Sequence, residues 1–359
     1  MPSSDQQQSS ANRSPFAPYA PPPLPGSATH EPPVAATGAA GEVPAIRLSV
    51  IVPAYNREQL IGVQLAALAA LAAQELDPAT WEVIVADNGS TDRTREVAAT
   101  FRGRLPGLRV VDASARRGVG HVRNVGVRAA RGESVVFVDD DDVVQPGWLA
   151  ATAAALERHE LVCCAHDYAS LNRSWLQRGR ADSQRDGLQR GWYPPYLYFA
   201  GGCGLGVRRA LHFAVGEFDE SLPVTADNDY CYRVQLAGTR LHFAREAVIA
   251  IRNRDDFWGS LRQARRWAEY HVLLAKRYRP DGARVPRVWR LYLWECKEWL
   301  KSVPRVRSRH DLAKCLWTLA WQVGQAVGAV RHRTTPIPDH DVPPEYERWA
   351  TAAAPSAVV

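Results

Sequence analysis

Residues 48–53 read Leu48-Ser49-Val50-Ile51-Val52-Pro53, a short run of mostly β-branched residues that ends at a proline. Such a run is typical of a buried strand. The segment 61–73 follows, with leucines at helical spacing. Further strands are predicted at 81–86, 108–111 and 134–138, and further helices through Val97 and over 119–130. These alternations of strand and helix predict a parallel, doubly wound α/β sheet.

Polar clusters follow three of the predicted strands, at 53–56, 87–90 and 139–142. Because ligands bind beyond the carboxyl ends of parallel strands, we expect these clusters to meet in one crevice. The sequence has no GxGxxG fingerprint after the first strand and no GxxxxGK[ST] motif. These absences disfavour a dinucleotide-dependent dehydrogenase and a P-loop NTPase.

Four consecutive carboxylates, Asp139 to Asp142, follow the apolar strand at 134–138. Their mutual repulsion would be costly without a cation, and oxygen ligands select hard ions such as Mg²⁺ or Mn²⁺. The alternative is a solvated acidic turn that caps the next helix. The position directly after a buried strand favours the metal site over that alternative.

The loop at 87–90 has two interpretations. Asp87 and Ser90 could bond locally to backbone N–H groups in a turn. Alternatively, Asp87 accepts a hydrogen bond from N3–H of a uracil or thymine ring, on which Tyr55 stacks.

Three other segments carry candidate residues. Arg123 lies in a helix that opens after small residues, where it could approach anionic groups, although the neighbouring glycines could also serve helix packing. Gly201 and Gly202 either let the backbone approach a ligand or form a bulged strand. Asp227 and Asp229 begin a predicted helix, and one of them could act as a general base while the other complements the helix dipole.

These motifs, in this order, resemble the family 2 glycosyltransferases of the GT-A fold over roughly residues 48–280. The resemblance implies a Rossmann-like, mostly parallel sheet, a nucleotide-diphospho-sugar donor, Mn²⁺ or Mg²⁺, and single displacement with inversion at the anomeric carbon. UDP or dTDP is the expected nucleotide. The chain departs from the family pattern at Ala226, where family members commonly carry an acidic residue.

The resemblance also implies roles for single residues. Asp227 corresponds to the general base and Asp141 to the metal ligand, while the acceptor side includes Gly201, Gly202 and Asp229. The residues expected at the donor are Pro53, Ala54, Tyr55, Asp87, Gly89, Arg123, Asp139 and Asp140. The acceptor could be a polysaccharide, a glycolipid or a small natural product.

Two other functions stay open at this stage. A nucleotidyltransferase that makes sugar nucleotides shares the parallel sheet and the carboxylate-held metal, but the segment 53–58 is not the glycine-rich phosphate loop that such an enzyme normally shows. A sugar-nucleotide binder without catalysis is suggested only by Ala226.

Composition divides the chain into four parts. Residues 1–45 hold 10 of the 25 prolines and are predicted to be a disordered leader. We expect the catalytic domain at 46–250, a helical extension at 251–335 and a flexible tail at 336–359. Six cysteines without a CxxC motif, no secretory signal and no apolar run of about twenty residues predict a cytoplasmic protein without a membrane-spanning helix.

The predicted extension is basic and rich in tryptophan. Residues 251–333 carry 19 Lys and Arg against 7 Asp and Glu, a net charge of +12, and eight of the 12 tryptophans lie beyond residue 250. The spacing of apolar residues predicts an amphipathic helix over 310–331. This extension could dock on the catalytic domain, or lie on the inner face of the cell membrane through its basic and tryptophan side chains. Nucleic-acid binding is disfavoured because no known module is visible.

Overall fold

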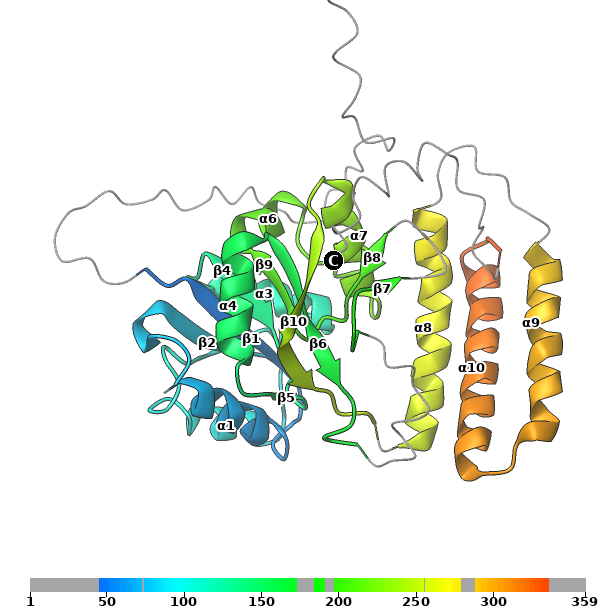
Figure 1. Ribbon diagram of the computed structural model, residues 1–359, viewed down its shortest axis with the longest axis horizontal. Coiled ribbons are helices and arrows are strands. Elements are labelled where there is room, and N and C mark those ends of the chain that lie inside the picture. Colours follow the sequence, from blue (N-terminus) through cyan, green and yellow to red (C-terminus); the bar gives the residue numbers. More distant parts are fainter. Residues whose placement is uncertain are drawn as a thin grey trace, which may run out of the picture.

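The computed structural model describes residues 45–72, 74–172, 184–190, 197–254, 256–278 and 288–335. Within these residues, the centre of the molecule is an eight-stranded sheet in the order β3-β2-β1-β4-β9-β6-β10-β5 (Figure 1). Its strands are β1 (Leu48–Ala54), β2 (Trp81–Asp87), β3 (Arg109–Asp112), β4 (Ser134–Phe137), β5 (Val143–Val144), β6 (Leu161–Asp167), β9 (Leu205–Arg208) and β10 (Leu241–Ala250). A separate antiparallel pair is formed by β7 (Gln189–Arg190) and β8 (Tyr198–Phe199).

The helices flank this sheet and continue beyond it. They are α1 (Ile61–Ala72), α2 (Thr94–Ala99), α3 (Val119–Ala129), α4 (Trp148–Arg158), α6 (Arg209–Ala214), α7 (Ala226–Leu236), α8 (Phe257–Arg277), α9 (Val288–Ser302) and α10 (Arg309–Arg331). Short 3₁₀ helices span Pro78–Thr80 and Val303–Arg305. The predicted leader, apart from residue 45, and the predicted tail lie outside the described residues.

The predicted α/β class is confirmed, with a sheet that is mixed rather than wholly parallel. Strand β1 pairs in parallel with β2 and β4, β2 with β3, and β6 with β10. Strand β9 runs antiparallel between β4 and β6, and β5 runs antiparallel to β10. The β-branched runs form the four predicted strands because both faces of the sheet are covered, which favours continuous apolar sequences.

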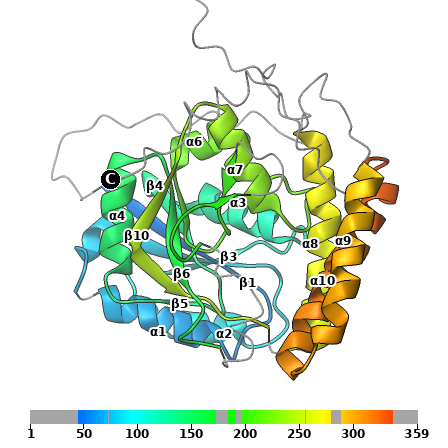
Figure 2. The same ribbon diagram turned by 45° about the vertical axis from the view of Figure 1, so that its right-hand side comes forward.

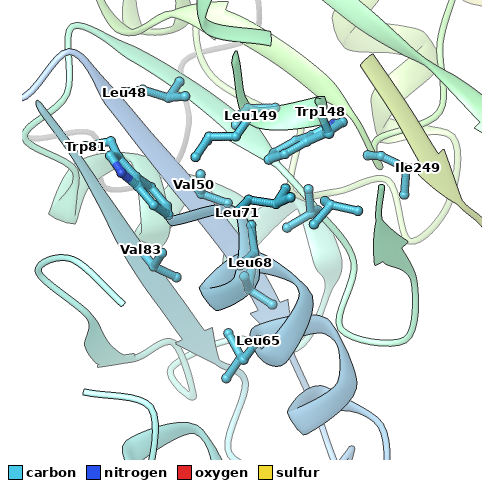
Figure 3. Packing of buried hydrophobic residues seen from close by; sticks show 14 of the residues in the cluster. Leu48, Val50, Leu65, Leu68, Leu71, Trp81, Val83, Trp148, Leu149 and Ile249 are labelled. Atoms are coloured by element: carbon cyan, nitrogen blue, oxygen red, sulfur yellow. The ribbon is translucent and has the colours of Figure 1, made fainter. Parts of the chain in front are cut away.

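Successive residues of β1 pack on opposite faces of the sheet. Val50 joins a cluster with Leu65 and Leu68 of α1 and with Trp148 of α4 (Figure 3). Ile51 joins the other cluster, which includes Phe218 and residues of α7. Strand β1 is packed on both faces of the sheet. Its last residues and the following one, 53–55, therefore lie at the edge of the sheet where the strands end.

The extension forms a layer of three helices, α8, α9 and α10, at one side of the sheet (Figures 1 and 2). Helix α10 covers the helix predicted over 310–331 and packs closely along α8. The predicted apolar face is not the buried one, because Leu312, Val323 and Val330 are exposed while Gly324 and Gly328 are buried. An added Cβ at Gly324 would lie 2.1 Å from the backbone oxygen of Arg265, and one at Gly328 would lie 2.7 Å from that of Glu269. Glycine at these positions therefore lets the two backbones approach. None of the described helices is both long and apolar enough to cross a membrane.

Candidate active site

A cavity of about 1440 Å³ opens beyond the ends of β1 and β4 and extends to the C-terminal helices. It brings together most of the residues predicted from the sequence: Pro53, Ala54, Tyr55, Arg123, Asp139, Asp140, Asp141, Gly201, Gly202 and Asp227. Asp87, Gly89 and Asp229 are not among the residues that line it. The expected convergence of strand ends therefore occurs, with three residues placed elsewhere.

The buried guanidinium of Arg123 links two sides of this cavity. Its Nη2 donates to Oδ1 of Asp139 at 3.1 Å, and its Cζ lies 5.8 and 5.6 Å from the ring centroids of Phe137 and Phe218. A Cβ at Gly202 would lie only 2.1 Å from Nη1 of Arg123. Residue 202 therefore has to be glycine for Arg123 to occupy this position.

Asp227 lies in the first turn of α7, and its carboxylate accepts two backbone hydrogen bonds. Gly202 N–H donates to Oδ2 at 2.9 Å and Asn228 N–H donates to Oδ1 at 3.0 Å. Burial raises the pKa of Asp227, while the charge of Arg123 and these hydrogen bonds oppose that rise. A carboxylate that faces a cavity with a raised pKa is suited to accept a proton from a bound hydroxyl.

The four consecutive aspartates have different surroundings. Asp140 accepts the Tyr55 N–H at 3.2 Å, Asp141 lies 3.7 Å from Nε of Arg57, and Asp142 accepts the Arg252 N–H at 2.7 Å. Burial, followed by repulsion from Asp141, raises the pKa of Asp140 to about 8. Burial and neighbouring carboxylates also raise the pKa of Asp141 and of Asp142. This crowding of negative charge is what a bound cation would relieve.

The carboxylates at the end of β4 fit a hard divalent ion, although the group that lies together differs from the predicted ligand, Asp141. Among the described residues, ligand atoms of Asp139, Asp142 and Cys203 all lie within 4.8 Å of one another. Burial raises the pKa of the Cys203 thiol well above its ordinary value, so the protonated sulfur is a poor ligand. The neighbouring carboxylates are the ligands that Mg²⁺ or Mn²⁺ would use, and the role of Asp141 stays a prediction.

The Asp87 carboxylate bonds to backbone N–H groups of its own turn, which is one of the two interpretations of the loop at 87–90. Its Oδ2 accepts the N–H groups of Gly89 and Ser90 at 3.1 and 3.0 Å, and Nε of Arg95 at 2.6 Å. The side chain is fully buried, and the residue of this loop that lines the cavity is Asn88. Asp87 and Gly89 do not line the cavity, but Oδ1 of Asp87 has no hydrogen-bond partner among the described residues, so the role of Asp87 at the donor stays a prediction.

Tyr55 presents an exposed ring, 37% accessible, at the predicted nucleotide end. Arg117 covers this ring, with Cζ 4.9 Å from the ring centroid and Nη1 donating to the tyrosine oxygen at 2.7 Å. Sequence reasoning missed Arg117 and Asn88. Asn88 lies in the loop at 87–90, where the role was given to Asp87, and Arg117 lies outside the motifs that the sequence analysis used. Asn88 also fixes the loop beside Arg117 by accepting the Gly118 N–H at 3.2 Å.

Asp229 lies in a buried ion cluster that joins α7 to α8. It accepts Nε of Arg233 at 2.8 Å, Nη1 of Arg277 at 2.6 Å and the hydroxyl of Tyr278 at 2.8 Å. Arg277 also donates to Asp219 at 2.9 Å. This cluster places Asp229 away from the predicted acceptor side, and gives it a role in holding the extension against the catalytic site.

Comparisons with known proteins agree with this geometry. The model described as glycosyl transferase family 2 matches residues 49–213, and that described as glycosyl transferase family group 2 matches residues 134–330, more than half of the chain. The poly(ribitol-phosphate) β-N-acetylglucosaminyltransferase TarS of Staphylococcus aureus is 37% identical over 115 residues, which are 32% of this chain and 19% of that protein. A validoxylamine A glucosyltransferase of Streptomyces hygroscopicus is 31% identical over 154 residues, 42% of this chain and 30% of that protein.

A solved structure shows the same fold. The mannosyltransferase PcManGT from Pyrobaculum calidifontis, in complex with GDP-Man and Mn²⁺, is 21% identical with a TM-score of 0.50, and the match covers 85% of this chain and 83% of that one. The chain thus has a GT-A-like fold. It belongs to glycosyl transferase family 2, which sets aside the nucleotidyltransferase alternative. The aligned stretches span less than a third of the curated relatives named above.

The ion cluster predicts that Asp229→Asn impairs stability. The variant leaves Arg233 and Arg277 facing a neutral amide in a buried site, and breaking one side of a buried pair costs about 3 kcal/mol. We expect the free energy of unfolding, measured by urea denaturation, to fall by about that amount. Asp186→Asn is the control because its side chain is exposed. An Asp229→Asn protein as stable as this control would contradict the assignment.

Proposed function

We propose that this chain transfers a sugar, with inversion, from a UDP- or dTDP-linked donor to an acceptor hydroxyl, with Asp227 as the general base. The observation that carries the proposal is that Asp227 and the acidic cluster line one cavity, with Arg123 between them. A single-displacement reaction needs a proton acceptor and a charged donor site that face the same space.

The base acts on the attacking hydroxyl. As the hydroxyl oxygen forms its bond to the anomeric carbon, Asp227 takes the hydroxyl proton, and the bond from that carbon to the diphosphate oxygen breaks. The N–H groups of Gly202 and Asn228 orient the carboxylate toward the cavity. Its raised pKa makes it a stronger base than an exposed aspartate.

The opposite wall is suited to hold the donor. Tyr55 offers an aromatic face for the base, and Arg117 supplies positive charge beside it. Arg123 supplies a second positive charge in the same cavity, next to Asp139. Asp139 and Asp142, with Asp141 as the ligand that the resemblance implies, would hold Mn²⁺ or Mg²⁺, and the ion would supply further positive charge for the departing diphosphate. The motifs that resemble the family lie within residues 46–250, which supports this segment as the catalytic domain. Residues 251–335 are then an extension that adds to the cavity wall.

We expect replacement of the general base Asp227 to reduce turnover without changing UDP affinity. Asp227→Asn keeps the size and hydrogen-bonding shape of the side chain but removes its basicity, so we expect release of the nucleoside diphosphate to slow by about 10² to 10⁴. The measurement is the initial rate of release from a UDP-sugar with Mn²⁺, together with the UDP dissociation constant. Unchanged UDP affinity is the internal control, and full turnover would show that another group takes the proton.

The donor assignment predicts nucleotide selectivity. In the presence of Mn²⁺, UDP or dTDP should raise the melting temperature more than GDP does. Tyr55→Ala should weaken UDP binding about tenfold, because stacking of a base on an aromatic ring contributes about 1–3 kcal/mol. Titration calorimetry measures this change, with Tyr168→Ala as a comparison at a tyrosine on another wall of the cavity. A preference for GDP would refute the expected donor.

A further inference from the structure

The cavity continues past Asp227 into a second part, which we name the aromatic groove. Its wall is formed by α8, α9 and α10 together with Phe199 of β8. Five of the wall residues are tryptophans: Trp267, Trp294, Trp299, Trp317 and Trp321. Figures 1 and 2 show these three helices at the side of the sheet where α7 lies. The proposed reaction does not use this groove, although it opens directly from the reacting site.

The rings form a continuous row that begins beside the proposed acceptor position. Phe199 precedes Gly201 by two residues, and its ring centroid lies 6.4 Å from that of His271. His271 lies 5.3 Å from Trp321, and Trp321 stacks on Trp317 at 5.3 Å with 22° between the ring planes. The row therefore leads from the loop that contacts Asp227, past α8, to α10.

Polar groups accompany these rings along the wall. The amides of Gln263, Gln322 and Gln325 and the carboxylates of Glu295 and Glu298 line the same groove. Nε1 of Trp317 and Oε1 of Gln325 find no hydrogen-bond partner within the part of the chain that the structure describes. Because buried polar atoms are nearly always paired in native proteins, such atoms on a cavity wall indicate a ligand that carries its own donors and acceptors.

The charge of the groove distinguishes between ligand classes. Its helical wall carries Glu295, Glu298 and Asp311 against Arg305 and Lys314, so positive charge does not dominate as a polyanion would require. A hydrocarbon chain would offer no hydrogen bond to Oε1 of Gln325 or Nε1 of Trp317, which is unfavourable for buried polar atoms. Sugar rings present apolar C–H faces that stack on aromatic side chains, and hydroxyl edges that hydrogen-bond to amides and carboxylates.

We infer that the aromatic groove binds the acceptor as a neutral oligosaccharide of several sugar units, laid along the row of rings with its accepting hydroxyl at Asp227. This inference rests on the proposed function and adds the chemical class of the acceptor. The transfer step is unchanged, since the acceptor hydroxyl gives its proton to Asp227 and the diphosphate leaves with the bonding electrons.

The test uses the full chain with UDP and Mn²⁺. A microarray of defined neutral oligosaccharides identifies the bound glycan, and calorimetry then compares its monosaccharide, disaccharide and tetrasaccharide. We expect the tetrasaccharide to bind at least tenfold more tightly than the monosaccharide. Trp317→Ala and Trp321→Ala should each weaken tetrasaccharide binding at least tenfold, while Trp321→Phe, which keeps an aromatic face, retains most of the affinity.

The matched control is Trp258→Ala. Trp258 lies on α8, is 66% exposed and does not line the cavity, so its loss should leave glycan affinity unchanged. Melting temperature and UDP affinity of every variant report whether it is folded and whether its donor site is intact.

Three results would overturn the inference: no neutral glycan on the array is bound, all lengths bind equally, or the tryptophan variants lose binding to vesicles that contain polyprenyl phosphate instead of to glycans. Each of these, with UDP affinity and donor hydrolysis intact, removes the oligosaccharide acceptor and leaves the proposed transfer standing. Loss of the general-base assignment would instead appear as an Asp227→Asn protein with full turnover.

Discussion

The site depends on one buried cation, the guanidinium of Arg123. Arginine stays charged at any physiological pH, so its burial requires an anionic partner, and Asp139 provides it at 3.1 Å. The same charge acts against the rise that burial causes in the pKa of Asp227. Arg123 therefore connects the acidic end of β4 with the proposed base on α7. The glycine at 202 gives the space for this connection and, through its N–H, orients Asp227.

Helix geometry assigns different tasks to the two aspartates of α7. Residues two apart on a helix point about 200° apart around its axis, so Asp227 and Asp229 cannot face the same space. Asp227 faces the cavity, while Asp229 turns inward to Arg233, Arg277 and Tyr278. Since Arg277 and the aromatic groove share α8, the ion cluster fixes the groove wall relative to the base. Stability and acceptor placement thus depend on the same contacts.

Much of the fold could be predicted from local sequence. The β-branched runs of β1, β2 and β4 lie in a sheet covered on both faces. Helix α10 packs on α8 through Gly324 and Gly328, not through its predicted apolar positions. The antiparallel β9 between β4 and β6 could not be predicted, because pairing of strands far apart in the sequence depends on the packing of the whole sheet. The motifs located the cavity correctly, since strand ends meet at one edge of a parallel sheet.

Single side chains were harder to assign. Asp87 and Asn88 are adjacent, and only the direction of each side chain at the end of β2 decides that Asn88 lines the cavity while Asp87 pairs with Arg95. The row of rings from Phe199 to Trp317 joins segments more than a hundred residues apart, so composition showed abundant tryptophan without showing where it gathers. Such assignments need the tertiary structure.

The most direct test of the role of Arg123 is the rate of nucleoside diphosphate release by Gly202→Ala. The three atoms nearest to the new methyl group would all belong to the Arg123 guanidinium, and Gly202 has no positive φ, so the backbone tolerates alanine. We expect at least a tenfold loss of rate, with a lower melting temperature because the buried guanidinium has to leave Asp139, and UDP binding at saturating nucleotide reports that the variant is folded. The control Gly103→Ala, which has open space around it, keeps full activity. A Gly202→Ala enzyme with the parent rate would contradict the central role of this contact.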